Sequence, residues 1–214
     1  MAYPYAPSES EGIDFIIQKA MEHTKDDPLW IIGLGAPTDM ASALLKEPEI
    51  ADRVVAFWHL RTAWPDKASN FNVFGDIHAA RFLFHSPLKF VLFDTGTHLN
   101  CPMEESESRV MTCGPLGKYL HEYRTGKYGT YGTESFQARL ARGMMDDNKG
   151  FFDLGDIAAM LAPEIASFEV VDCPDVGHDV VYQFNGARGK ILRCYDIDRD
   201  QTFDLLYKAL ESYK

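Results

Sequence analysis

Three largely apolar runs divide the first half of the chain, and amphipathic stretches separate them. The runs are 29–35 (LWIIGLG), 53–60 (RVVAFWHL) and 88–95 (LKFVLFDT). Continuous apolar runs of this length are typical of strands buried on both faces of a parallel sheet. Their alternation with amphipathic stretches predicts an α/β fold, in which an open, mostly parallel sheet is flanked by helices.

Helices are expected before and between these runs. Apolar residues in 13–21 repeat at i, i+3, i+4, i+7 and i+8, which gathers them on one face of a helix. Ser8 and Glu11 have the spacing of a capping box for that helix. The helix after the first run is expected to begin at Thr38 or Asp39. The order of helix, strand and helix supports the α/β interpretation.

The second half of the chain is predicted to add helices and then three short strands. Asp76 is a candidate N-cap for the helix before the third run. Residues 125–133 (TGKYGTYGT) are interpreted either as a lid whose tyrosines stack on a base or as an ordinary loop. The other expected elements are a helix opened by Pro115, a helix ending near Met145, a helix at 153–161, strands at 167–171, 179–184 and 190–197, and a closing helix at 199–213.

The length and composition indicate one globular domain. The chain has 214 residues, of which 46% are hydrophobic and 25% charged, and we find no internal repeat and no linker. The first ten residues hold two prolines and several polar residues. We therefore expect a flexible tail over 1–10 and a single domain over 11–214.

Charge and cysteine usage exclude several classes of protein. The formal net charge of −11 argues against a nucleic-acid partner, because phosphates attract clustered Lys and Arg. No run reaches the roughly 18 apolar residues of a membrane span, and the N-terminus lacks the basic and apolar regions of a signal peptide. The four cysteines are too scattered for a zinc site. We expect reduced thiols in a cytoplasmic protein.

Asp94 raises the question of a protease, because Asp94-Thr95-Gly96 has the form of a pepsin-like catalytic motif. Such proteases need two aspartates that share a proton between all-β lobes. This motif occurs once here, and it ends an apolar run that is entered from a helix. We therefore interpret Asp94 as the end of a strand near the ligand edge of an α/β sheet, not as a protease acid.

Several segments, in order, resemble the inosine–uridine nucleoside hydrolase family. Residues 31–50 (IIGLGAPTDMASALLKEPEI) are similar to its glycine-proline-leucine-threonine-asparagine segment and the helix that follows. Residues 69–98 resemble its Glu-Phe-Asn segment, the next helix and a strand ending in Asp-Val-Thr-His. Residues 151–165 resemble its His-Asp-Pro-Leu-Ala segment, and the tail from Cys194 resembles its last strand and helix. The resemblance covers most of 11–214 and implies a Rossmann-like nucleoside hydrolase core.

The resemblance implies cleavage of the N-glycosidic bond of ribonucleosides, which yields ribose and free base. In such reactions the transition state resembles an oxocarbenium ion. A bound Ca²⁺ grips the ribose diol and lowers the pKa of a water that a nearby Asp deprotonates. The implied partner is therefore a nucleoside or another ribose-like small molecule.

The same resemblance assigns candidate metal and substrate residues. The backbone carbonyl of Thr38 and the carboxylate of Asp153 are implied calcium ligands, although both positions are equally suited to capping helices. Asn72 matches a ribose-contacting Asn, but it is also plausible as a loop residue. Asn70 replaces a Glu, so it can still bond a hydroxyl but carries no charge. Phe152 replaces a His that protonates the departing base; an aromatic ring can stack on a base but cannot donate a proton.

One departure from the family changes the functional expectation. The family opens with a strand and an Asp-x-Asp-x-x-x-Asp-Asp segment, which supplies the general base and most calcium carboxylates. This chain begins after that region, so it is expected to be N-terminally truncated relative to the family and to lack the first strand or strands. Ca²⁺ needs about 6–8 oxygens, and Asp153 with the Thr38 carbonyl offers too few. We expect calcium to be weak or vestigial, and no catalytic residue is assigned.

Two functions from different classes remain open. The first is a nucleoside hydrolase whose activity is impaired or depends on a complementing chain that carries the Asp cluster. The second is a non-catalytic module on the same fold, which binds a nucleoside or sugar or serves assembly. Missing strands would expose a sheet edge, so a homo-oligomer or a complementing chain is expected. The sequence leaves open whether the chain is an active enzyme.

Overall fold

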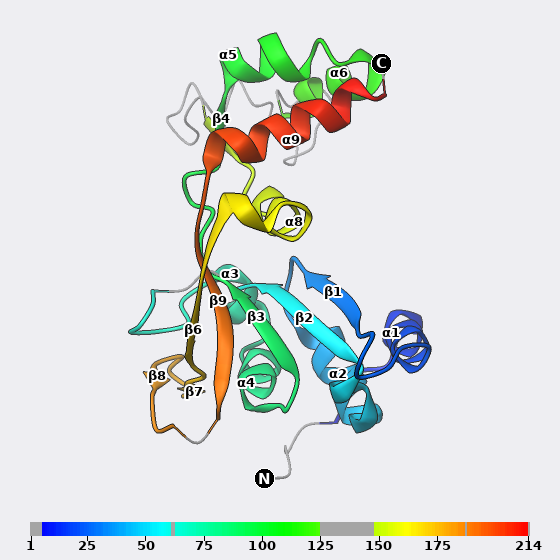
Figure 1. Ribbon diagram of the computed structural model, residues 1–214, viewed down its shortest axis with the longest axis vertical. Coiled ribbons are helices and arrows are strands. Elements are labelled where there is room, and N and C mark those ends of the chain that lie inside the picture. Colours follow the sequence, from blue (N-terminus) through cyan, green and yellow to red (C-terminus); the bar gives the residue numbers. More distant parts are fainter. Residues whose placement is uncertain (1–5, 61–62, 125–147, 187, 214) are drawn as a thin grey trace, which may run out of the picture. The chain divides into compact units, whose positions relative to one another are not determined.

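The computed structural model describes residues 6–60, 63–124, 148–186 and 188–213 (Figure 1). The chain forms two compact units. The first comprises Met1–Thr95 with Ala166–Asp196, and the second comprises Gly96–Ile165 with Ile197–Lys214. The segment 125–133, interpreted above as a lid or a loop, lies outside the described residues, and the expectation of a single domain over 11–214 stays a prediction.

The first unit contains a five-stranded sheet in the order β1-β2-β3-β9-β6 (Figure 1). Parallel pairing joins β1 to β2, β2 to β3 and β3 to β9, with Trp30 opposite Val55 and Phe57 opposite Val91. The bounds of the strands are β1 Leu29–Gly33, β2 Val54–His59, β3 Lys89–Phe93, β6 Ala166–Asp172 and β9 Lys190–Ile197. The three apolar runs of the sequence are therefore the strands β1 to β3, as expected.

The last strand of the sheet, β6, runs against β9. The amide of Cys173 donates to the carbonyl of Gly189 at one end of this pair, and that of Asp198 donates to Ile165 at the other. A small antiparallel hairpin of β7 (Asp175–Val176) and β8 (Tyr182–Gln183) connects them. The sheet is therefore mixed and mostly parallel, which confirms the expected fold class.

Helices of the first unit pack on alternate residues of the central strands. Val54, Ala56 and Trp58 of β2 belong to one buried cluster with Phe90 and Leu92 of β3. The cluster is completed from the helices by residues such as Ile13, Met40, Leu44, Leu83 and Phe84. The helices are α1 Glu11–Met21, α2 Thr38–Lys46, η1 Pro48–Asp52, α3 Phe71–Gly75 and α4 Ile77–His85.

The caps of these helices correct one expectation and confirm another. Ser10, not Ser8, caps α1, because its side chain accepts the amide of Ile13 over 3.2 Å. The amide of Ser8 instead donates to the hydroxyl of Ser42 on α2 over 3.1 Å. Asp76 caps α4 as predicted. The capping-box spacing was misleading because Ser10, two residues later, directly precedes the first helical residue.

The second unit is mainly helical. Its strands β4 (Asn100–Pro102) and β5 (Asn148–Gly150) pair antiparallel. Its described helices are α5 Met103–Glu105, η2 Ser106–Val110, α6 Gly114–Arg124, α8 Leu154–Leu161, η3 Pro163–Ile165 and α9 Arg199–Glu211. In the described part of the chain no helix has both the length and the hydrophobicity that a bilayer crossing demands.

Arg199 fixes the start of α9 within this unit. Its guanidinium forms an ion pair with Glu105 and donates to the carbonyl of Asn100 over 2.8 Å. The hydroxyl of Tyr207, two turns along α9, donates to the same carboxylate over 2.7 Å. Burial opposes ionisation of Glu105, but the hydrogen bonds from Arg199 and Tyr207 outweigh it and hold the pKa of Glu105 below its usual value.

Candidate functional site

The turn between β1 and α2 carries Thr38 at the carboxyl end of the parallel strands, where ligands collect in open α/β sheets. Thr38 is the first residue of α2, and Pro37 precedes it as an N-cap without a side-chain bond. The hydroxyl of Thr38 donates to Asp76 over 2.8 Å. Neither Thr38 nor Asp39 caps α2, so the Thr38 side chain instead ties α2 to the start of α4.

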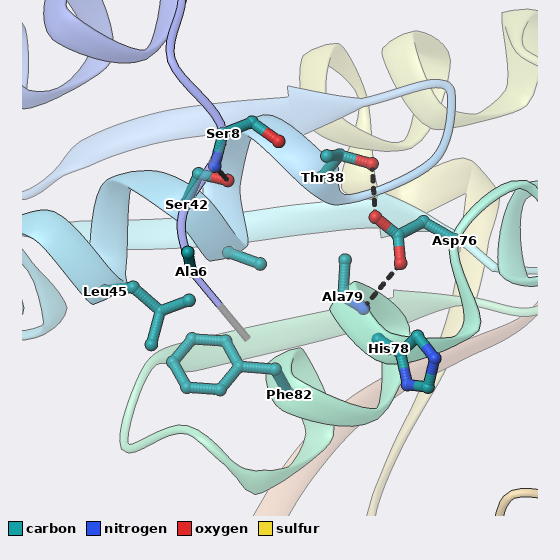
Figure 2. A pocket seen from close by; sticks show the side chains of 10 residues that line it. Ala6, Ser8, Thr38, Ser42, Leu45, Asp76, His78, Ala79 and Phe82 are labelled. Atoms are coloured by element: carbon teal, nitrogen blue, oxygen red, sulfur yellow. Dashed lines mark hydrogen bonds between the residues drawn. The ribbon is translucent and has the colours of Figure 1, made fainter. Parts of the chain in front are cut away.

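A cavity of about 190 Å³ lies beside this hydrogen bond, between α2 and α4 (Figure 2). The hydroxyl of Thr38 and the carboxylate of Asp76 meet at one side of it, and Phe82 and Leu45 form an apolar wall. Both oxygens of Asp76 are engaged, one with Thr38 and one with the amide of Ala79. The N-terminal segment also contributes, and the full lining is Ala6, Ser8, Thr38, Ala41, Ser42, Leu45, Asp76, His78, Ala79 and Phe82.

Two side chains hold the turn that leads to Thr38. The indole N–H of Trp58 donates to the carbonyl of Gly35 over 2.8 Å. The side-chain amide of Asn72 donates to the carbonyls of His59 over 2.8 Å and Leu34 over 3.3 Å. Sequence reasoning missed Trp58, because a Trp in an apolar run signals core packing and not a tether.

Asn70 and Asn72, the predicted ribose contacts, both lie at α3. Asn70 is the N-cap, and its side-chain oxygen accepts the amide of Asn72 over 2.7 Å. Asn72 is only 8% exposed. Its side-chain NH₂ donates to backbone carbonyls, so the side-chain oxygen is the polar atom that can contact a ligand. For Asn70 the remaining group is the NH₂, which can only donate a hydrogen bond.

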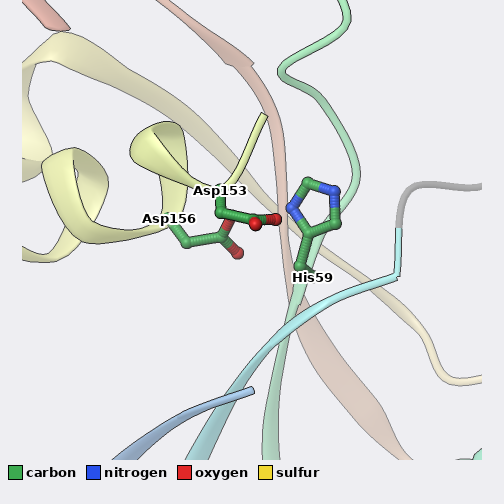
Figure 3. A group of neighbouring side chains, drawn as sticks. All are labelled: His59, Asp153 and Asp156. Atoms are coloured by element: carbon green, nitrogen blue, oxygen red, sulfur yellow. The ribbon is translucent and has the colours of Figure 1, made fainter. Parts of the chain in front are cut away.

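Asp153 and Asp156 form a carboxylate pair at the start of α8 in the second unit (Figure 3). Their carboxylate oxygens lie within 4.8 Å of each other. Asp153 is exposed at the N-cap position but makes no capping bond, whereas Asp156 is fully buried. The sequence analysis did not identify Asp156, although its i, i+3 spacing from Asp153 places both on one helix face.

Phe152 precedes this pair and is 42% exposed. Its ring covers Gly150, where an added Cβ would lie 2.3 Å from the ring. The glycine therefore lets the far end of the aromatic ring come close to the backbone. An exposed ring held in this way can stack on a planar ligand but has no proton to donate.

His59 ends β2 in the first unit and is also drawn in Figure 3. It is 5% exposed, and its ring centroid lies 5.6 Å from that of Phe93. Imidazole and carboxylate are both common metal-ligand groups. Sequence reasoning did not single out His59, because a lone His in an apolar run is most simply explained as a core residue.

Asp94 is held in an ion pair at the end of β3. Its side chain is 1% exposed, and it accepts from Nε of Arg193 over 2.7 Å. Arg193 also reaches Glu169 over 2.5 Å, and its guanidinium lies 5.0 Å from the ring centroid of Trp64. This satisfied, buried pair agrees with the interpretation of Asp94 as a strand-terminal structural residue.

The oxygen atoms of these residues are of the type that a hard divalent cation binds, but they are fewer than such an ion needs. The carboxylates of Asp153 and Asp156 are hard ligands of the type that Ca²⁺ or Mg²⁺ prefers. In a helix the carbonyl of the first residue normally accepts the amide four residues on, which leaves the Thr38 carbonyl less free for a metal. About 6–8 oxygens are needed for Ca²⁺, and the described residues supply fewer.

Comparison with known proteins gives a family and a fold. The sequence model of the inosine-uridine preferring nucleoside hydrolases matches residues 2–204. A plant nucleoside hydrolase is similar in structure, with 20% identity, a TM-score of 0.71, and coverage of 97% of this chain and 69% of that one. The purine-preferring ribonucleoside hydrolase of Gardnerella vaginalis has 18% identity, a TM-score of 0.73, and coverage of 98% and 68%.

A third similar structure is the type III effector protein XopQ complexed with adenosine diphosphate ribose. It has 12% identity, a TM-score of 0.64, and coverage of 95% of this chain and 65% of that one. No curated protein matches the sequence. At these identities the structures establish the fold, whereas the sequence model spans almost the whole chain. The chain therefore belongs to the inosine-uridine preferring nucleoside hydrolase family.

Proposed function

We propose that the protein binds the ribose of ribonucleosides and hydrolyses their N-glycosidic bond slowly, or only with a complementing chain. The observation that carries this proposal is the family match over residues 2–204. The carboxylate pair of Asp153 and Asp156 supports it, because it adds an anionic donor that the resemblance alone did not supply. The low rate is expected because the described residues supply fewer carboxylates than a full calcium site needs.

In this proposal Asp153 and the Thr38 carbonyl are ligands of a weakly bound calcium ion, and Asp156 adds a further carboxylate. When bound, the ion would hold the ribose diol and lower the pKa of a water. Asp153 is the better ligand, since its carboxylate is exposed and makes no capping bond. Asp156 is buried beside it, where its carboxylate can fix the position of Asp153 or of a bound ion.

Asn70, Asn72 and Phe152 are proposed to contact the nucleoside. The side-chain oxygen of Asn72 would accept from a ribose hydroxyl, because its NH₂ is already held by two backbone carbonyls. The NH₂ of Asn70 would donate, because its oxygen caps α3. Phe152 would stack on the base but leave it unprotonated. Loss of a general acid typically costs about 10²–10⁴ in rate.

A non-catalytic binding protein is the second candidate, and Phe152 favours it, since its exposed ring can hold a base without protonating it. The fold of the XopQ complex with adenosine diphosphate ribose is consistent with binding alone. A reducing compartment, and thus the cytoplasm, is proposed for either candidate. All four cysteines are buried, and no disulfide joins them.

The test is release of ribose from purine and pyrimidine nucleosides, measured with added Ca²⁺ and then with EDTA. We expect slow, calcium-dependent release that Asp153→Ala abolishes. The matched control is Asp172→Ala, which removes a surface carboxylate that pairs with Lys190. Binding of nucleoside without release, both by this chain alone and with a second chain that carries the family's Asp-x-Asp-x-x-x-Asp-Asp segment, would establish the second candidate. Neither binding nor release, by a folded protein at high concentration, would contradict both.

A further inference from the structure

The cavity between α2 and α4 has a polar end and an apolar wall (Figure 2). Thr38 and Asp76 stand at the polar end, and Phe82 and Leu45 form the apolar wall. All residues of its lining belong to the first unit. Its volume of about 190 Å³ is below the roughly 300–1,000 Å³ of pockets for drug-sized ligands. Its shape therefore suits a small molecule with one polar group on a short apolar body.

The two side chains at the polar end present hydrogen-bond acceptors to the cavity. The hydroxyl of Thr38 donates its proton to one carboxylate oxygen of Asp76 over 2.8 Å, and the amide of Ala79 donates to the other over 2.9 Å. Each carboxylate oxygen can accept a further bond, and Oγ of Thr38 keeps its lone pairs. Since the proton of Thr38 is already used, a ligand at this end has to be the donor.

Asp76 also brings a negative charge that its neighbours only partly compensate. Its two hydrogen-bond donors are uncharged, and no Lys or Arg of the described chain forms an ion pair with it. His78, the other titratable residue of the lining, is exposed to solvent. The start of α4 supplies a partial charge of about +0.5. A cationic donor would complete the compensation, and its hydrogen bonds would be roughly twice as strong as neutral ones.

The remaining wall of the cavity is held in place by contacts within the chain. Ala6 and Ser8 line the cavity from the N-terminal segment. The amide of Ser8 donates to the hydroxyl of Ser42 on α2 over 3.1 Å, and Glu9 forms an ion pair with Lys46 over 2.8 Å. These contacts fasten the segment along α2. The cavity is therefore already formed without a ligand, which lowers the ordering cost of binding.

We propose that this cavity is a binding site for a small organic ammonium ion with an apolar body. The ammonium group has three N–H donors and no acceptor, which matches an end that presents acceptors. It would donate to the carboxylate of Asp76 and to Oγ of Thr38, while the apolar body packs on Phe82 and Leu45. An aromatic body is favoured, because it can stack on the ring of Phe82. The bound ion would link α2 to α4.

The experiment is a calorimetric titration of the whole chain at pH 7 with three ligands that share one ring. Benzylamine carries an ammonium group, benzyl alcohol a neutral hydroxyl and benzoate a carboxylate. We expect benzylamine to bind with a dissociation constant of about 10⁻⁴–10⁻³ M, as suits a ligand of so few atoms. Benzyl alcohol should bind about tenfold more weakly or less, and benzoate should not bind. Saturating benzylamine should also raise the melting temperature.

A matched pair of variants separates this site from general attraction of cations to a chain of net charge −11. Asp76→Asn removes the charge but keeps a good N-cap for α4, and it should weaken benzylamine binding by about tenfold or more. Asp39→Asn removes an exposed carboxylate outside the lining and should leave binding unchanged. If Asp76→Asn fails to fold, the three ligands still decide. No binding of benzylamine, equal binding of benzyl alcohol or benzoate, or equal losses in the two variants would overturn the proposal.

Discussion

The indole N–H of Trp58 donates to the carbonyl of Gly35 over 2.8 Å, which ties the end of β2 to the turn before α2. The ring of Trp58 also lies against Gly33, where an added Cβ would come within 2.1 Å of it. Trp58 is 5% exposed, so both contacts are shielded from water. The position of Thr38, three residues after Gly35, therefore depends on a residue of the neighbouring strand.

The hydrogen bond from Trp58 can be removed while the packing of its ring is largely kept. Trp58→Phe is expected to lower the free energy of unfolding by about 1–2 kcal/mol, from the lost bond and a small cavity. Urea denaturation at low protein concentration measures this. Trp30→Phe, at a half-exposed site, should change the value by no more than about 0.5 kcal/mol. Equal effects of the two substitutions would show that the tether to Gly35 contributes little.

Two neighbouring glycines should respond differently to the same substitution. Gly33→Ala places a Cβ inside the ring of Trp58, and the strain is expected to cost about 1–3 kcal/mol or more. Gly35→Ala meets nothing within 4 Å and serves as the control. Thermal or urea unfolding of both variants compares them directly. If both unfold like the parent, Trp58 does not occupy the position described.

Removing only one partner of the Asp94–Arg193 ion pair should strongly lower the free energy of unfolding. Arg193→Met leaves a carboxylate that is 1% exposed without its charged partner, and a loss of about 3–5 kcal/mol is expected. Asp94→Asn combined with Arg193→Met should recover part of that loss. Lys190→Ala removes an exposed pair with Asp172 and should cost at most about 1 kcal/mol. Urea unfolding of all three variants measures these differences in stability. A double variant that is no more stable than Arg193→Met would contradict the expectation.

The depressed pKa of Glu105 predicts a loss of stability in acid. Burial opposes its ionisation, but hydrogen bonds from Arg199 and Tyr207 lower its pKa below 4.5 in the folded protein. The stabilisation is therefore complete above pH 4.5, the unfolded value, and is lost as the pH falls through the lower folded value. Glu105→Gln should flatten the acid side of the stability profile, while Glu104→Gln, its exposed neighbour, should not. A profile of Glu105→Gln that falls as steeply as that of the parent would refute this.

The strands were predictable from the sequence because burial on both faces leaves continuous apolar runs. Residues 53–60 and 88–95 formed β2 and β3 for that reason, whereas 29–35 formed β1 although that strand is only partly buried. The antiparallel direction of β6 was not predictable, since it depends on the short β7–β8 hairpin and not on a local pattern. Such a reversal is visible only once the strands are paired.

The candidate site was only partly predictable. The resemblance identified Asp153, but Asp156 and the tethers from Trp58 and Asn72 depend on contacts between residues distant in sequence or on burial. The same holds for the edge of β1. Trp30, the exposed aromatic residue of that strand, was not singled out from the sequence.

The proposed calcium-assisted ribose site has, among the described residues, fewer carboxylates than tight binding of the ion needs. Calorimetric titration of Ca²⁺ into the protein, with and without D-ribose, tests it most directly. We expect a dissociation constant of about 10⁻⁴–10⁻³ M, tighter binding when ribose is present, and loss of both in Asp153→Ala but not in Asp172→Ala. Calcium binding that ribose does not strengthen, or that survives Asp153→Ala, would contradict the account.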